Sequence, residues 1–230
     1  MTGDRLKALI YMGFGGNGIA QGYFSTTGAD NDLDSAIAAA IDEVLLNMSP
    51  NADQGDYSIQ TIAAGTGDGA TEAFALDDAV LRPLHVFIND YEVCPVKSRD
   101  FRRIVGAYIN AESDSVDDTW YACITGRNIR IFPYLSSTDV VKIYYVAKCD
   151  EDLTSLDDEL AKVPLPYQNA VVAYAQFLLS HKAKGQWPGD PLIFQKEYLM
   201  AMSEGHRLSS EGFRDGIYPM QASNWAFEEL

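Results

Sequence analysis

The sequence predicts an α+β protein, in which a bundle of about three helices carries an inserted antiparallel β-sandwich or small barrel. Apolar residues recur at the helical period after residue 30 and again after residue 163. Between these segments the chain consists of short aromatic and β-branched runs separated by turn-forming clusters. The expected division is a flexible N-terminal arm of residues 1–29, a helical bundle of residues 30–56 and 150–210, a β domain of residues 57–149 and a flexible C-terminal arm of residues 211–230.

The first helix is expected near residues 30–48. Its apolar positions are Leu33, Ile37, Ile41, Val44 and Met48. Asp30, Asp32 and Asp34 lie at its start, where negative charge meets the positive end of the helix dipole. Their alternate spacing is also found in calcium-binding loops, but Ser35 and Ile41 occupy the positions that such a loop gives to glycine and glutamate. We therefore interpret these acids as a helix start.

Two later helices are predicted, near residues 166–184 and 190–205. Pro166 is suited to the first position of a helix, where the missing N–H costs nothing. The helix that follows it has few polar positions, which predicts burial on more than one side. Asp190 is the expected N-cap of the last helix, and Gly205 its expected end.

The middle of the chain contains seven expected strands. They span residues 57–64, 72–76, 84–88, 102–109, 119–125, 128–132 and 140–147. No helical segment of crossover length is recognisable between them, so parallel βαβ units are excluded and an antiparallel arrangement is predicted.

Near the N-terminus, Gly13, Gly15 and Gly18 match the G-x-G-x-x-G outline of a dinucleotide-binding turn. That turn needs a helix beginning at the third glycine and an acidic residue at a strand end roughly 20 residues later. Gly22 and Gly28 interrupt the required helix, and the nearest acids open a helix instead. We reject nucleotide binding and expect a flexible or partner-ordered arm.

The remaining candidates for chemistry are His85, His181 and His206, the cysteines Cys94, Cys123 and Cys149, and the acidic loop around Asp114, Asp117 and Asp118. The histidines lack metal-site spacing and are expected at the surface or at helix ends. The cysteines lie in strand-like stretches and are expected as buried, reduced thiols. The acidic loop is expected to be solvated. We therefore expect no catalytic residues, no metal site, no cofactor and no enzymatic activity.

The chain is strongly acidic, with 33 acids, 17 bases and a formal net charge of −16. Phosphate binding requires the opposite sign, so specific nucleic-acid binding is not expected. No apolar run approaches the ~20 residues needed to cross a bilayer, and the first residues lack a signal-peptide core. We expect no membrane contact and synthesis in a reducing cytosol.

Two segments carry a family resemblance. VPLPYQNAVVAYAQFLLSHKAK, residues 163–184, resembles the helix that follows a β insertion in the head-to-tail adaptor (connector or neck) proteins of tailed, especially short-tailed, bacteriophages. The matching positions are Leu165, Pro166, Tyr167, Ala170, Val171, Tyr174 and Ala175. Residues 64–93 are similar to the opening hairpins of β modules in phage virion proteins. The architectural likeness covers roughly residues 30–210, and the connection GQWPGDP departs from it by being longer and stiffer.

The resemblance implies a structural virion protein at the head–tail interface, made in the cytoplasm of the host bacterium. It implies a dodecameric ring that binds the phage portal protein and tail or neck proteins. The genomic DNA would pass through the ring without specific binding. We expect more acidic than basic side chains on the inner surface, because a basic lumen would hold the phosphates in place. The alternative is that the acids are spread evenly over the surface and serve solubility alone.

Two sets of residues are expected to bind partners. The aromatic residues of the C-terminal arm are Phe213, Tyr218, Trp225 and Phe227, and they have no use on an irregular segment unless they anchor on a neighbour. Arg99, Arg102 and Arg103 are expected at a docking edge of the β domain.

The alternative is a soluble ligand- or carbohydrate-binding β module, or a small enzyme built on the β region. Trp120 and Tyr121 favour it, because exposed aromatic rings stack on sugars, although strand alternation turns one of the pair toward the core.

The rejected glycine motif gives a direct test. Titration calorimetry of the protein with NAD, FAD and ATP should show no binding in the micromolar range, because the phosphate-binding helix N-terminus is missing from the sequence pattern. Saturable micromolar binding of any of the three would contradict this interpretation.

Overall fold

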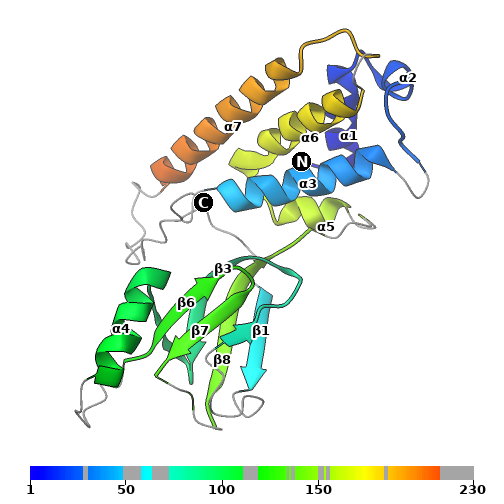
Figure 1. Ribbon diagram of the computed structural model, residues 1–230. Helices are drawn as coiled ribbons and strands as arrows, with labels where there is room; N and C mark the ends of the chain where they lie inside the picture. Colours follow the sequence, from blue (N-terminus) through cyan, green and yellow to red (C-terminus); the bar gives the residue numbers. More distant parts are fainter. Residues whose placement is uncertain are drawn as a thin grey trace. The chain divides into compact units, whose positions relative to one another are not determined.

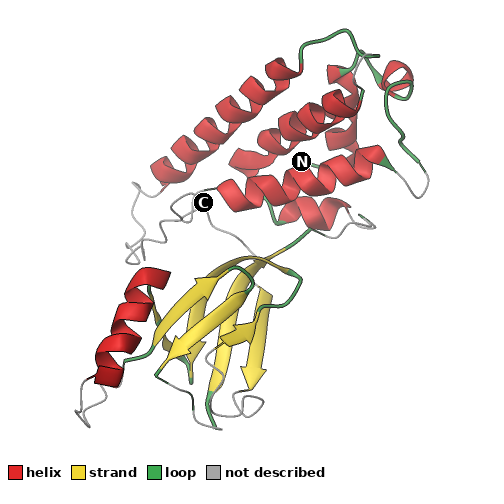
Figure 2. Cartoon of the chain, in the orientation of Figure 1, coloured by secondary structure: helices red, strands yellow, loops and turns green. Residues whose placement is uncertain are grey.

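The computed structural model describes residues 1–27, 31–48, 58–63, 73–110, 119–133, 135, 138–149, 153, 156–183 and 186–212. The described parts of residues 1–56 and 148–222 form one compact unit, and those of residues 57–147 form a second. We call them the helical unit and the β unit. Figure 2 shows helices making up the first, and strands together with one helix making up the second. The β domain was expected over residues 57–149, and the described second unit falls within residues 57–147.

The helical unit is built around one central helix. Its elements are α1 (Gly3–Gly13), α2 (Asn17–Ala20), α3 (Asp32–Asn47), α5 (Leu156–Ala161), the short 3-10 helix η2 (Leu165–Tyr167), α6 (Gln168–Lys182) and α7 (Pro191–Gly212). Helix α6 packs against α1, α3 and α7 (Figure 1). The helices expected near residues 30, 166 and 190 correspond to α3, α6 and α7.

Helix α6 can take neighbours on several sides because its buried residues are small. Ala170, Val171 and Ala175 are fully buried, which lets other helix backbones approach closely. The buried Gln176 is satisfied by donating its side-chain N–H to the carbonyl of Leu9 at 3.0 Å. The scarcity of polar residues in this part of the sequence is therefore explained, because the helix is buried on nearly all sides.

The first 27 residues are part of the helical unit, which corrects the expectation of a flexible N-terminal arm. Thr2 caps α1 by accepting a hydrogen bond from the Arg5 N–H at 3.4 Å. Leu6 and Ile10 are fully buried, and α1 packs on α6. This i, i+4 apolar stripe was obscured in the sequence by the glycines that follow it.

Those glycines make a tight turn after α1. Gly15 and Gly16 have φ angles of 89° and 109°, a region that side chains disfavour. A Cβ atom on Gly13 would lie 2.4 Å from Nε2 of Gln176. A helix, not a strand, precedes the motif, so its glycines serve backbone geometry and close packing.

The same turn delivers Phe14 into an aromatic cluster. Its ring centroid lies 5.2 Å from that of Phe24, 5.1 Å from that of Trp187 and 5.6 Å from that of Phe194. Phe14 is 2% exposed. The cluster ties the N-terminal segment and the segment before α7 together, which accounts for the long GQWPGDP connection.

The β unit contains two four-stranded sheets. Its elements are β1 (Ser58–Ala63), β2 (Ala73–Ala75), β3 (Val80–Ile88), β4 (Tyr91–Glu92), β5 (Cys94–Pro95), α4 (Ser98–Asn110), β6 (Tyr121–Thr125), β7 (Asn128–Phe132) and β8 (Val140–Ala147). The strand orders are β1-β8-β3-β4 and β2-β7-β6-β5, and the described strands do not close a barrel. Both sheets contribute to one apolar cluster, which includes Ile88, Val141 and Ile143 from one sheet and Ile129 and Ile131 from the other.

Helix α4 overturns two expectations. Residues 102–109 were expected as a strand, but they lie in this helix. The apolar residues Phe101, Ile104 and Val105 share one helix face, and their β-branched composition conceals the helical spacing. Strand β5 pairs with β6 in parallel, with Cys94 opposite Tyr121, and α4 lies in the connection between them. The exclusion of a parallel βαβ unit was therefore wrong, while the other strand pairs of the described residues are antiparallel.

Helix α7 continues to Gly212, beyond its expected end at Gly205. Gly205 is buried against the ring of Tyr167, which is itself fully buried. The Tyr167 hydroxyl lies 3.2 Å from Nδ1 of His206 and accepts a hydrogen bond from Ser209 at 3.3 Å. Gly205 is thus a packing position inside the helix.

Replacing Gly205 with alanine tests this contact. The added Cβ would lie 2.5 Å from Cδ1 of Tyr167, so overpacking should exceed the gain in helix propensity and lower the free energy of unfolding by about 1–2 kcal/mol. Denaturant or thermal unfolding measures the change. A Gly205→Ala protein as stable as the original would show that the helix can shift to admit a methyl group.

Candidate functional site

The outer face of α4 carries three arginines, Arg99, Arg102 and Arg103. Their i, i+3, i+4 spacing places them on one side of the helix, and all three are exposed. The opposite side packs against the β unit through Phe101, which is 3% exposed. Because that apolar side fixes the rotation of the helix, the arginines are held toward solvent.

The α4 arginines differ from other bases of the β unit. Arg127 pairs with Asp78 at 2.9 Å, and Lys142 pairs with Asp90 at 2.6 Å. Within the described part of the chain, no carboxylate pairs with any of the three α4 arginines. The helix contains only one acid, Asp100, so three bases against one acid give it a net charge of +2 in a chain of net charge −16.

A glycine lies on the same face. Gly106 follows Arg102 by four residues and Arg103 by three, so it shares their side of α4. A Cβ atom on Gly106 would meet no described atom within 4 Å. Glycine inside a helix costs about 1 kcal/mol relative to alanine, and the space beside Gly106 would admit a methyl group. We call the surface formed by Arg99, Arg102, Arg103 and Gly106 the α4 face.

The predicted docking arginines are therefore brought together, but by a helix face and not by a strand edge. The predicted aromatic anchors Phe213, Tyr218, Trp225 and Phe227, and the acids Asp114, Asp117 and Asp118, lie outside the described residues.

The aromatic pair proposed for sugar stacking is used in packing. Trp120 is half-buried against the apolar cluster shared by the two sheets. Tyr121 is half-buried against the cluster beneath α4, beside Phe101 and Phe132. The observation that favoured a carbohydrate-binding module is thus accounted for by the core of the β unit.

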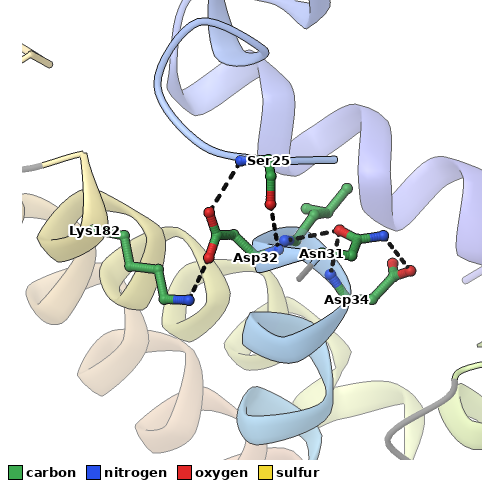
Figure 3. A network of polar contacts seen from close by, with 6 residues as sticks. Ser25, Asn31, Asp32, Asp34 and Lys182 are labelled. Carbon is green, nitrogen blue, oxygen red and sulfur yellow. Dashed lines mark hydrogen bonds and ion pairs between the residues drawn. The ribbon is translucent and has the colours of Figure 1, made fainter. Parts of the chain in front are cut away.

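The acids at the start of α3 form a capping network (Figure 3). Asn31 is the N-cap and accepts hydrogen bonds from the N–H groups of Leu33 and Asp34 at 3.1 and 3.2 Å. Ser25 and Asp32 exchange two hydrogen bonds of 3.0 Å, and Lys182 pairs with Asp32. The hydrogen bonds from Lys182 and Ser25 to the ionised carboxylate lower the pKa of Asp32. These donors belong to the chain itself, in keeping with a helix start.

A second polar cluster holds the segment after β8. The Cys149 N–H donates to Asp42 of α3 at 2.7 Å, and burial raises the pKa of Asp42. Burial and the neighbouring Glu159 raise the pKa of the Cys149 thiol far above its ordinary value, so it stays protonated and is not a nucleophile. Glu159 is buried and accepts a 2.7 Å hydrogen bond from Lys162. The cluster fixes residue 149 between α3 and α5.

The histidines each have a local role. His85 lies 2.8 Å from a carboxylate oxygen of Glu92, His181 meets the ring of Phe177 edge to face, and His206 contacts Tyr167. Cys123 is buried, as expected. No group of three or more His, Cys, Asp and Glu residues in the described part of the chain could hold a metal ion.

Sequence reasoning missed an exposed apolar surface on α7. Leu192, Ile193, Leu199 and Met200 are between 51% and 64% exposed. Phe194, Tyr198 and Met202 form the buried side of the same helix. The signal was present, because apolar residues on both sides of an outer helix exceed what one core requires.

No protein family matches the chain, and no curated protein sequence matches it significantly. None of the described helices is both long enough and apolar enough to cross a bilayer.

The open space at Gly106 predicts a change in stability opposite in sign to that predicted for Gly205→Ala. Gly106→Ala should raise the free energy of unfolding of the β unit by about 0.5–1 kcal/mol, because the methyl group meets no described atom and helix propensity improves. Thermal unfolding of the Gly106→Ala and Gly205→Ala proteins in parallel measures the difference between their stability changes. A destabilised Gly106→Ala protein would mean that the glycine is required within the chain.

Proposed function

We propose that this chain is a structural, ring-forming adaptor of a tailed-bacteriophage virion, which joins the portal to the tail and lines the DNA channel. One observation carries the proposal: a β unit is inserted between α3 and α5 of a helical unit whose central helix bears the adaptor-like motif. Within that motif Tyr167, Ala170, Val171 and Ala175 are fully buried. These buried motif residues thus take part in the packing of the helical unit. This is expected of a family signature that reflects a shared architecture.

The two exposed surfaces also support an assembly role. The α4 face is basic, whereas α7 exposes the apolar residues Leu192, Ile193, Leu199 and Met200. Surfaces of different chemistry are suited to heterologous contacts, in which one patch of a subunit meets another patch of the next subunit. Repeated contacts of this kind close into rings when the rotation allows.

The charge suits a channel that does not hold DNA. A net charge of −16 per subunit would be repeated around a ring, and phosphates would be repelled and not bound. In this proposal the inner surface carries more acids than bases. The bases are used in protein contacts, and the aromatic residues after Gly212 anchor on neighbouring proteins.

The test is assembly with the portal protein of the same virion. The full chain should form a ring on the portal, seen by mass photometry and negative-stain microscopy at physiological salt. A chain that ends at Gly212 keeps every described helix and should fold, as judged by circular dichroism, but should fail to join the particle. A full-length protein that stays monomeric and ignores the portal, but is retained on a glycan array, would overturn the proposal in favour of a binding module.

A further inference from the structure

We propose that the α4 face of one copy docks on an acidic surface of the helical unit of a second copy, at the first turns of α1 and α5. This inference rests on the proposed ring-forming function and identifies one of its subunit contacts. It assigns a role to the three outward arginines, with which no described carboxylate pairs, and to the open space above the glycine among them.

The basic side of the contact is preorganised. Arg99, Arg102 and Arg103 are fixed outward by the apolar side of α4, and no described carboxylate pairs with them. Guanidinium groups bind carboxylates through two parallel hydrogen bonds, which makes arginine suited to protein interfaces. Gly106 leaves the helix surface flat between them, so an opposing backbone can approach closely.

The acidic side lies in the helical unit. The exposed Asp4 is in the first turn of α1, and the exposed Asp157 and Asp158 are in the first turn of α5. The Gly3 N–H donates to Asp157 at 2.5 Å, which holds these two helix starts together. Three carboxylates therefore share one region of surface with a single neighbouring base in the first turn of α1, Arg5.

The charge distribution favours a second copy over DNA as the occupant. Residues 57–147 hold 8 of the 17 bases and 12 of the 33 acids, which leaves a net charge of −4 there and −12 in the rest of the chain. A helical unit of another copy is thus an acidic partner that is present at every assembly site. A DNA duplex would instead be repelled by the acids of both units.

A basic patch on one unit and an acidic patch on the other make a head-to-tail contact. With such a contact, both patches of every subunit are occupied only if the series of subunits closes into a ring.

Charge reversal tests the contact. Arg102→Glu with Arg103→Glu removes the basic patch, and Asp4→Lys with Asp158→Lys removes the acidic patch, while Asp157 keeps its bond to Gly3. Lys142→Glu is the control, because Lys142 lies on β8 of the other sheet of the same unit, whereas α4 packs on β6, and the change removes only an exposed ion pair with Asp90. The readout is the particle mass by mass photometry over a range of protein and salt concentrations, with circular dichroism to verify folding.

Each double variant alone should raise the protein concentration needed for half-maximal assembly at least about tenfold, and the control should not. A mixture of the two double variants should recover rings of alternating subunits, because the reversed α4 face of one variant meets the reversed patch of the other, and the two unreversed patches meet in the next contact. The quadruple variant, with both patches reversed, should recover assembly. Gly106→Leu should fold normally yet weaken assembly, because the added side chain separates the surfaces.

Two results would overturn the inference. One is a ring that forms equally well with the Arg102→Glu and Arg103→Glu variant. The other is binding of duplex DNA by the original protein at physiological salt that this variant abolishes. Either would leave the proposed adaptor function standing, whereas an original protein that forms no assembly with itself or the portal would contradict that function instead.

Discussion

The helical unit depends on the close approach that the small side chains of α6 allow. Ala170 and Ala175 are fully buried, so neighbouring helices contact this helix along most of its circumference. Two glycines extend the same principle, since Gly13 approaches Gln176 of α6 and Gly205 approaches Tyr167 at its start. A larger residue at any of these positions would push a helix away and open the core that the other helices share.

The β unit differs from the helical unit, because a helix, α4, completes the packing of its sheets. Phe101, on the apolar side of α4, packs with Phe132 of β7 and Cys123 of β6. The parallel pairing of β5 with β6 follows from the same helix, which gives the chain the length needed to return in the same direction. The outward arginines are thus a consequence of core packing on the inner side, and the interface that we propose for them depends on that packing.

Polar contacts join segments that are distant in sequence without creating a reactive site. Lys182 reaches Asp32 at the start of α3, and Asp42 holds the backbone of Cys149. Each of these acids meets donors from the chain, and the buried thiol is kept protonated. Of the groups that sequence reasoning weighed as candidates for metal binding or catalysis, Asp32 and Cys149 instead make contacts within the helical unit.

The sequence alone determined the α+β class, the positions of α3, α6 and α7, and most strands, because long apolar periods report local geometry directly. Helices α1 and α4 became evident only in the tertiary structure. In α1 the apolar stripe of Leu6 and Ile10 is short and is followed by glycines. In α4 the β-branched residues suggest a strand, and the helix is recognised only when the arginine face is seen opposite Phe101. Arg99, Arg102 and Arg103 were predicted from their charge to bind a partner, but only the helix placed them on one face with Gly106. Gly205 likewise looked like a helix end, because the approach of a distant tyrosine ring is a property of packing and leaves no local pattern.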